Sequence, residues 1–370
     1  MPQGTRKQDS IAVQARQIEI DQTFDAIIVG AGFAGMYMLH CLRKLGLSSC
    51  VFETGSGVGG TWYWNRYPGA RCDVESMQYS YSFSEKLDQD WSWSEKYSPQ
   101  PEILAYANHV ADRFDLWKDI RFDTTVTAAT FDSKLKKWTV ETDRGDLAHA
   151  QFCIMAVGCL SAANIPDFKD INKFEGPIYH TGQWPHDGAK IKGRHVGIIG
   201  TGSSAIQAIP IIAEQVESLT VFQRTPNYSI PAWNENLDQN YEKEVKASYP
   251  ELRAKARARP AGFYFPFNTE SALEAAPEER QQQYEKRWQK GGLPFLGAYG
   301  DLLFEQEAND TVAEFVRQKI RNIVKNPATS ELLCPDNVLG CKRLCVDTGY
   351  YEVFNQEHVN LIDISDNPIE

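Results

Sequence analysis

The stretch Ala26-Ile27-Ile28-Val29-Gly30-Ala31-Gly32-Phe33-Ala34-Gly35 decides the fold of this 370-residue chain. The apolar run 26–29 predicts a buried strand, and the glycines that follow have the spacing G-x-G-x-x-G before the helix-forming residues 36–45. A second apolar run, 49–52, predicts the next strand, which ends at Glu53. Strand, glycine turn, helix and strand predict a βαβ unit. In such a unit the first glycine permits a sharp turn, the second lets backbone N–H groups approach a pyrophosphate, and the third lets the helix pack closely.

The same pattern returns at residues 196–222. Val196-Gly197-Ile198-Ile199 precedes Gly200-Thr201-Gly202-Ser203-Ser204-Ala205, a helix is expected through residue 212, and residues 219–222 predict another strand. Alanine at the third glycine position is compatible with the pattern, because that position serves helix packing rather than phosphate contact. We therefore predict an α/β fold with two Rossmann-like dinucleotide-binding domains.

The residues at the ends of the two second strands differ in charge. Glu53 suits the hydroxyls of an unmodified ribose and repels a 2′-phosphate, whereas Arg224, beside Thr225, offers a guanidinium to a 2′-phosphate. This difference favours FAD at the first turn and NADPH at the second, with hydride passing from nicotinamide to flavin. Glycine turns that bind no ligand are the alternative. The predicted cofactor-binding residues of the two turns are Gly30, Gly32, Gly35, Glu53, Gly200, Thr201, Gly202, Ser203, Ser204, Arg224 and Thr225.

Composition excludes several classes of protein. The net charge of −11 argues against nucleic acid as a partner, since such binding needs clustered cations. Residues 1–21 contain no secretory signal, and the longest apolar stretch, 26–39, is too short to span a membrane. The eight cysteines show no CxxC pair and no metal-ligand spacing, so we predict no metal site and mostly buried, reduced thiols in a cytoplasmic protein.

Changes in residue pattern and charge along the chain suggest the domain boundaries. Strands are expected over 131–140 and 151–157, with a turn at 143–146. Charged helices are expected over 239–259, 278–290 and 309–325, the last beginning with a capping box from Thr311 to Glu314. The cationic run 253–259 and the helix 278–290 are expected to be solvated faces. The predicted parts are a flexible tail (1–21), the FAD-binding domain (22–158), the first part of the NADP-binding domain (159–233), a helical insertion (234–327) and the return of the NADP-binding domain (328–370).

Two further segments carry a family resemblance. Residues 59–73, GGTWYWNRYPGARCD, match G-G-x-W-x-x-x-x-Y-P-G-x-x-x-D, and residues 174–186, FEGPIYHTGQWPH, match F-x-G-x-x-x-H-x-x-x-W-P. Both resemble the fingerprints of type I Baeyer-Villiger monooxygenases, and several stretches are most similar to the phenylacetone branch, with the cyclohexanone and steroid branches further off. The resemblance implies a bound FAD that NADPH reduces, a flavin C4a-peroxide formed with O2, and conversion of a ketone to an ester or lactone.

The resemblance also implies roles for individual residues. Arg343, in the segment 340–345, matches the active-site arginine, which stabilises negative charge and holds the nicotinamide, and Asp73 matches the carboxylate that positions it. Lys342 would face the 2′-phosphate, and His180 would link domain movement to catalysis. A purely structural histidine and packed aromatic side chains, Trp62 included, are the alternatives. The implied catalytic residues are Arg343, Asp73 and His180, and the implied additional cofactor-binding residues are Gly60, Trp62, Asp73, Lys342 and Arg343.

Two other functions remain open from the sequence. A flavin N-hydroxylating monooxygenase would use the same two nucleotide sites, and a non-catalytic FAD- and NADP-binding module would bind cofactors without oxygen transfer. Members of the resembled family continue past the point where this sequence stops, so we expect a C-terminally truncated chain. The expected partners are a small ketone and O2, with no protein partner implied.

Overall fold

The computed structural model describes residues 22–369, so the predicted tail at 1–21 lies outside the described residues. The chain divides into two compact units: one ends at Gly60 and resumes over Ala111–Cys159, and the other comprises Thr61–Val110 and Leu160–Glu370. Residues 61–110, which the sequence analysis assigned to the first domain, therefore cluster with the second unit. The assignment of the domains to FAD and NADP remains a prediction.

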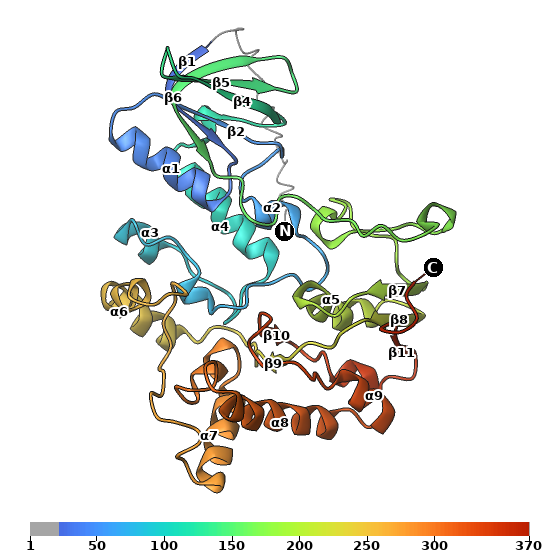
Figure 1. Cartoon of the computed structure of the whole chain (residues 1–370). Helices are drawn as coiled ribbons and strands as arrows, with labels where there is room; N and C mark the ends of the chain where they lie inside the picture. The colour runs from blue at the N-terminus through green and yellow to red at the C-terminus, as the bar shows by residue number, and fades with distance from the viewer. Residues whose placement is uncertain (1–21, 370) are drawn as a thin grey trace, which may run out of the picture. The chain divides into compact units, whose positions relative to one another are not determined.

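The first unit is built on a mixed six-stranded sheet (Figure 1) of order β3-β2-β1-β6-β5-β4. Strand β1 pairs in parallel with β2 on one side and with β6 on the other. Helix α1 connects β1 to β2, as the βαβ pattern predicts. The elements are β1 (Gln22–Val29), α1 (Phe33–Lys44), β2 (Ser49–Phe52), β3 (Ile120–Arg121), β4 (Val126–Asp132), β5 (Lys137–Thr142) and β6 (Leu147–Met155).

The antiparallel edge of this sheet corrects one expectation. The predicted strand 131–140 is instead a hairpin, in which β4 and β5 pair with Asp132 opposite Lys137. Lys136 adopts a positive φ of 51°, and the Asp132 carboxylate accepts the N–H groups of Lys134 and Leu135. This local turn chemistry interrupts an otherwise strand-like run.

The second unit contains two small parallel sheets. Strands β7 (His195–Ile199), β8 (Ser218–Gln223) and β11 (Val359–Asp363) form one sheet of order β11-β8-β7, with α5 (Ser203–Ala213) joining β7 to β8. Strand β9 (Ser229–Pro231) pairs with β10 (Cys345–Asp347) in the other sheet. Within the segment 328–370, strand β11 therefore pairs with β8 in the same sheet as β7, the strand before the second glycine turn. The two parallel glycine-turn units confirm the predicted α/β fold.

Helices and irregular loops make up the rest of the second unit (Figure 1). A buried aromatic cluster joins α7, α8 and the turn at residues 293–297; it includes Tyr284, Trp288, Phe295 and Phe315. Short 3₁₀ turns occur at Ser76–Gln78, Ile171–Lys173, Thr181–Gln183, Leu293–Gly297 and Glu352–Asn355 in this unit, and at Trp117–Asp119 in the first. The helices are α2 (Thr61–Trp64), α3 (Glu85–Asp90), α4 (Gln100–Arg113, which ends in the first unit), α6 (Gln239–Arg257), α7 (Pro277–Lys290), α8 (Gln306–Ile323) and α9 (Pro327–Leu333).

Three details of these helices differ from expectation. Helix α8 begins at Gln306, so Thr311 is not a capping residue; its hydroxyl bonds to the Ala308 carbonyl and the Tyr284 hydroxyl. Arg253 is only 8% exposed and donates to the Gln78 carbonyl, and Arg287, also 8% exposed, donates to the Gly297 carbonyl. Two cations predicted to be solvated are therefore buried, because backbone carbonyls of neighbouring loops accept their hydrogen bonds.

Within residues 22–369, no helix combines the length and the apolar character needed to cross a membrane. No group of three or more acidic, cysteine or histidine side chains in the same range could hold a metal ion.

Candidate active site

The first glycine turn lies between β1 and α1. Gly30 has φ of +104°, and a Cβ there would lie 2.6 Å from the Ala156 carbonyl oxygen, so backbone crowding requires glycine. A Cβ on Gly60 would lie 2.9 Å from the Cα of Gly32, so the loop that contains Gly60 lies directly against the glycine turn. A Cβ on Gly35 would overlap the Gly30 carbonyl. No side chain caps α1 and no acid occupies its first turn, so its N-terminal end offers N–H groups and a positive dipole to an anion.

Glu53 lies at the end of β2 and is 6% exposed. One carboxylate oxygen accepts the N–H of Ala31 at 2.6 Å, and the other accepts the N–H of Gly55 at 2.7 Å. One of these charge-assisted hydrogen bonds therefore holds the glycine turn, and the other holds the loop that follows β2. The predicted contact of Glu53 with a ribose stays a prediction.

The second glycine turn repeats this arrangement between β7 and α5. Gly200 has φ of +103° and a backbone N–H bonded to the Phe222 carbonyl. The Thr201 hydroxyl donates to the Thr225 carbonyl at 2.9 Å, and α5 begins after Gly202 with no capping side chain and no acid in its first turn. This turn is also suited to an anion. Arg224 and Lys342 are both exposed, and their joint contact with a 2′-phosphate remains a prediction.

The structure brings Arg343 and Asp73 together, although 270 positions separate them. Nε and Nη2 of the guanidinium donate to the two carboxylate oxygens at 2.9 and 2.8 Å, the two-pronged geometry expected of an arginine–carboxylate pair. The Arg343 side chain is 67% exposed and that of Asp73 only 14% exposed. Exposed ion pairs contribute at most about 1 kcal/mol to stability, so the pair mainly orients a cation at an accessible surface.

The groups flanking this pair are neutral thiols. Burial raises the pKa of Cys72 and of Cys345 to about 12 in each case. Strand β10, which begins at Cys345 and follows Arg343, packs against α5, the helix of the second glycine turn. The cation is therefore linked to the predicted NADPH site through β10.

Sequence reasoning missed one residue that organises this region. Gln207 lies in α5 and is 6% exposed; its amide oxygen accepts the Tyr67 hydroxyl at 2.9 Å, and its amide nitrogen donates to the Arg71 carbonyl at 3.1 Å. A Cβ on Gly69 would overlap the Gln207 carbonyl, so the segment lies directly on the helix. A lone polar residue in the apolar run 205–209 is the signal that could have identified it. Gln207 thereby fixes the segment that ends at Asp73 to the helix of the second glycine turn.

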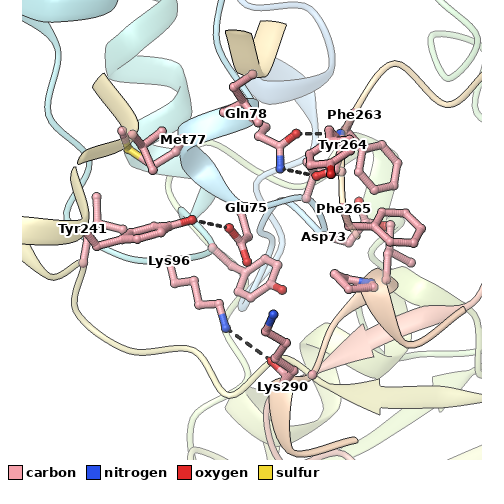
Figure 2. Close-up of a pocket in the computed structure, with 18 of the residues that line it drawn as sticks. Asp73, Glu75, Met77, Gln78, Lys96, Tyr241, Phe263, Tyr264, Phe265 and Lys290 are labelled. Atoms are coloured by element: carbon pink, nitrogen blue, oxygen red, sulfur yellow. Dashed lines mark hydrogen bonds between the residues drawn. The ribbon is translucent and has the colours of Figure 1, made fainter. Parts of the chain in front are cut away.

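A cavity of about 550 Å³ adjoins Asp73 within the second unit (Figure 2). Figure 2 shows Phe263, Tyr264 and Phe265 on one side and Glu75 near Tyr241 on another. Most of its surface is apolar, which suits an organic molecule with few polar groups. Other residues that line the cavity include Val74, Met77, Gln78, Lys96, Tyr97, Leu252, Lys290, Leu293 and Pro294.

The other two predicted site residues occupy different surroundings. The His180 ring is half-buried, and its Nδ1 accepts the Gly182 N–H at 3.1 Å, so it caps the turn Thr181–Gln183 and carries its proton on Nε2 when neutral. Trp62 is 8% exposed, and its indole N–H donates to the Tyr79 hydroxyl at 2.9 Å. The linkage role of His180 and the flavin contact of Trp62 remain predictions.

Comparison with known proteins places this geometry in a family. The family model described as "Pyridine nucleotide-disulphide oxidoreductase" matches residues 27–258. The chain belongs to the pyridine nucleotide-disulphide oxidoreductase family. Over 94% of its length it is 42% identical to a Baeyer-Villiger monooxygenase of Pseudooceanicola batsensis, and over 95% it is 41% identical to a phenazine N-monooxygenase of Lysobacter antibioticus. It spans 64% and 66% of these two relatives, respectively.

Solved structures agree with the assignment. A steroid monooxygenase bound to NADP is 54% identical, with a TM-score of 0.89 over 93% of this chain and 66% of that one. The structure of OTEMO in complex with FAD and NADP is 38% identical, with a TM-score of 0.90 over 93% of this chain and 66% of that one. The resemblance to Baeyer-Villiger monooxygenases is confirmed, and the proximity to the phenylacetone branch stays a prediction.

Proposed function

We propose that this protein is an NADPH- and FAD-dependent Baeyer-Villiger monooxygenase that converts ketones to esters or lactones. The observation that supports this most is that Asp73, which lines a largely apolar cavity, orients the guanidinium of Arg343. A permanent cation fixed in this way stabilises negative charge that develops on oxygen during the reaction. The names of the relatives support the same reaction class.

The residues of the two glycine turns fit the two cofactors. In the first unit, the uncapped start of α1, the close crossing of Gly60 over Gly32 and the carboxylate of Glu53 form a cradle for the pyrophosphate and adenosine of FAD. In the second unit, the turn at Gly200 and the exposed Arg224 and Lys342 suit the pyrophosphate and 2′-phosphate of NADPH. Bound FAD would supply the activation of O2. Overall, one ketone, one O2, one NADPH and one proton would give one ester, one NADP⁺ and one water, with one oxygen atom of O2 in the ester and the other in the water.

The protein's own residues would bind and orient the substrate. We propose that the cavity beside Asp73 receives the ketone, with the aromatic side chains of Phe263 and Phe265 against its apolar part. Arg343 would lie beside the carbonyl oxygen and hold the negative charge that appears there. Asp73 keeps the guanidinium in place, and His180 would connect the segment 174–186 to movement of the domains.

One relative favours a second candidate function. The phenazine N-monooxygenase is 41% identical, and the open, aromatic-lined cavity also suits a planar heteroaromatic amine. The same two nucleotide turns would serve that reaction. N-oxidation of a heteroaromatic amine is therefore the second candidate, and it is one form of the N-hydroxylating monooxygenase that the sequence left open.

Product analysis under ¹⁸O₂ distinguishes these functions. Flavin-loaded protein with NADPH should convert phenylacetone to benzyl acetate containing one ¹⁸O atom. Phenazine N-oxide formed without any ester would favour the alternative. NADPH consumption that yields only hydrogen peroxide with both substrates would contradict both monooxygenase proposals.

We further propose a cytoplasmic location. All eight cysteines are free thiols, two of them (Cys159 and Cys341) exposed, and free thiols persist in a reducing compartment. Only Cys50, Cys72 and Cys345 are buried, which corrects the expectation that the thiols are mostly buried.

A further inference from the structure

The cavity beside Asp73 contains a carboxylate that the proposed reaction does not use. Glu75 is half-buried and lines the cavity (Figure 2), two residues beyond the aspartate that holds Arg343. Its Oε2 accepts the Tyr241 hydroxyl at 2.9 Å. Among the side chains of residues 22–369, this phenol is the one hydrogen-bond partner of the carboxylate, and none of the cations there forms an ion pair with it.

The other charged groups of the cavity are already engaged or lie at its rim. Asp73 is paired with Arg343. The Lys96 ammonium points to the Lys290 carbonyl at 3.4 Å and lies over the Tyr97 ring at 5.5 Å. Glu235, Asp238 and Lys290 are exposed. Glu75 is thus the inward carboxylate that a bound molecule could still pair with.

A half-buried carboxylate bonded only to a phenol favours a cationic ligand. Burial, with the negative charge of Glu75, raises the pKa of Tyr241, so the phenol stays protonated and donates to the carboxylate. The second oxygen of Glu75 retains its lone pairs, and a charge-assisted bond from an ammonium group would satisfy them in surroundings less screened than water. The apolar residues Val74, Met77 and Phe263 beside it would cover a hydrocarbon linker.

We propose that Glu75 forms a subsite for a protonated amine, so that the preferred ketones carry an ammonium group at the end remote from the carbonyl. This inference rests on the proposed function, because it takes the cavity as the ketone site. The ammonium would be anchored at Glu75 while the carbonyl is directed toward Arg343, which is held by the nearby Asp73.

Calorimetric titration with matched ketones tests the subsite. The probes are 4-(4-aminomethylphenyl)butan-2-one, its uncharged and nearly isosteric 4-ethylphenyl analogue, and the 4-hydroxymethylphenyl compound as a neutral donor. The wild-type holoenzyme should bind the ammonium ketone about tenfold more tightly than the ethyl analogue, with the neutral donor between them. Glu75→Gln should abolish this preference, while Glu244→Gln, an equal change at an exposed position of α6 outside the cavity, should keep it.

A second variant tests the subsite even if Glu75→Gln fails to fold. Tyr241→Phe removes the phenol hydroxyl but leaves the carboxylate, so the ammonium preference should persist or increase. Equal affinities of wild type for the three ketones, no measurable binding of any of them, or an unchanged preference in Glu75→Gln would each overturn the subsite.

Measuring ester formation from the same ketones distinguishes failure of the subsite from failure of the proposed reaction. Ester formation from the ethyl analogue without an ammonium preference would refute the subsite and leave the proposed function intact. An ammonium preference in binding without ester from any ketone would support the subsite and refute the reaction.

Discussion

Arg343 and Asp73 are far apart in the chain, and no periodicity or spacing rule joins them. Their pairing was predicted because each matches a residue of the resembled family, and the structure brings the two side chains into direct contact. Gln207 and Glu75 were not predicted, since their importance depends on which side chains the fold places beside them. The contact between Arg343 and Asp73 is thus observed, whereas their roles in the reaction stay a prediction.

Replacing Arg343 tests its role directly. Arg343→Ala should leave flavin reduction by NADPH largely possible but lower ester formation by about 100-fold or more, since the cation for negative oxygen is lost. NADPH oxidation should then yield hydrogen peroxide. Rapid-mixing absorbance of the flavin and chromatography of the ester measure the two steps.

The control for this prediction is Arg194→Ala, which removes an exposed guanidinium just before β7. It should leave both steps near wild type. An ester yield from Arg343→Ala equal to that of the control would remove Arg343 from the reaction.

At the scale of elements, hydrophobic pattern and glycine turns predicted the βαβ units closely. The start of α8 and the hairpin at β4–β5 were missed for a physical reason: a helix can extend past an apparent cap, and a turn of polar residues can interrupt a run of strand-forming residues. The burial of Arg253 depends on carbonyls of a distant loop, which no local pattern reveals.

Helix α5 offers a stability prediction. Gln207→Leu should lower the free energy of unfolding by about 1–3 kcal/mol, because the Tyr67 hydroxyl and the Arg71 carbonyl lose their buried partner. Gln215→Leu, at an exposed position whose amide bonds the Ile211 carbonyl, should change it by less than about 0.5 kcal/mol. Denaturant titrations of the two variants measure these changes, and equal stabilities would show that the Gln207 contacts contribute nothing.

At the scale of the whole molecule, each unit contains one glycine turn, and the charged side chain that follows the turn has the opposite sign in the two units. The first has the inward carboxylate of Glu53, and the second has the exposed guanidinium of Arg224. This contrast, visible in the sequence, is the basis for assigning different dinucleotides to the two units. The sequence did not reveal that residues 61–110 belong to the second unit, because that assignment depends on which residues they pack against.

Anaerobic reduction of the bound flavin tests the central claim most directly. The purified yellow protein should lose its flavin absorbance rapidly with NADPH and about tenfold or more slowly with an equal, subsaturating concentration of NADH, and Arg224→Ala should shrink that difference. Protein that neither contains nor takes up flavin, or a flavin that the two nicotinamides reduce at equal rates, would contradict the account.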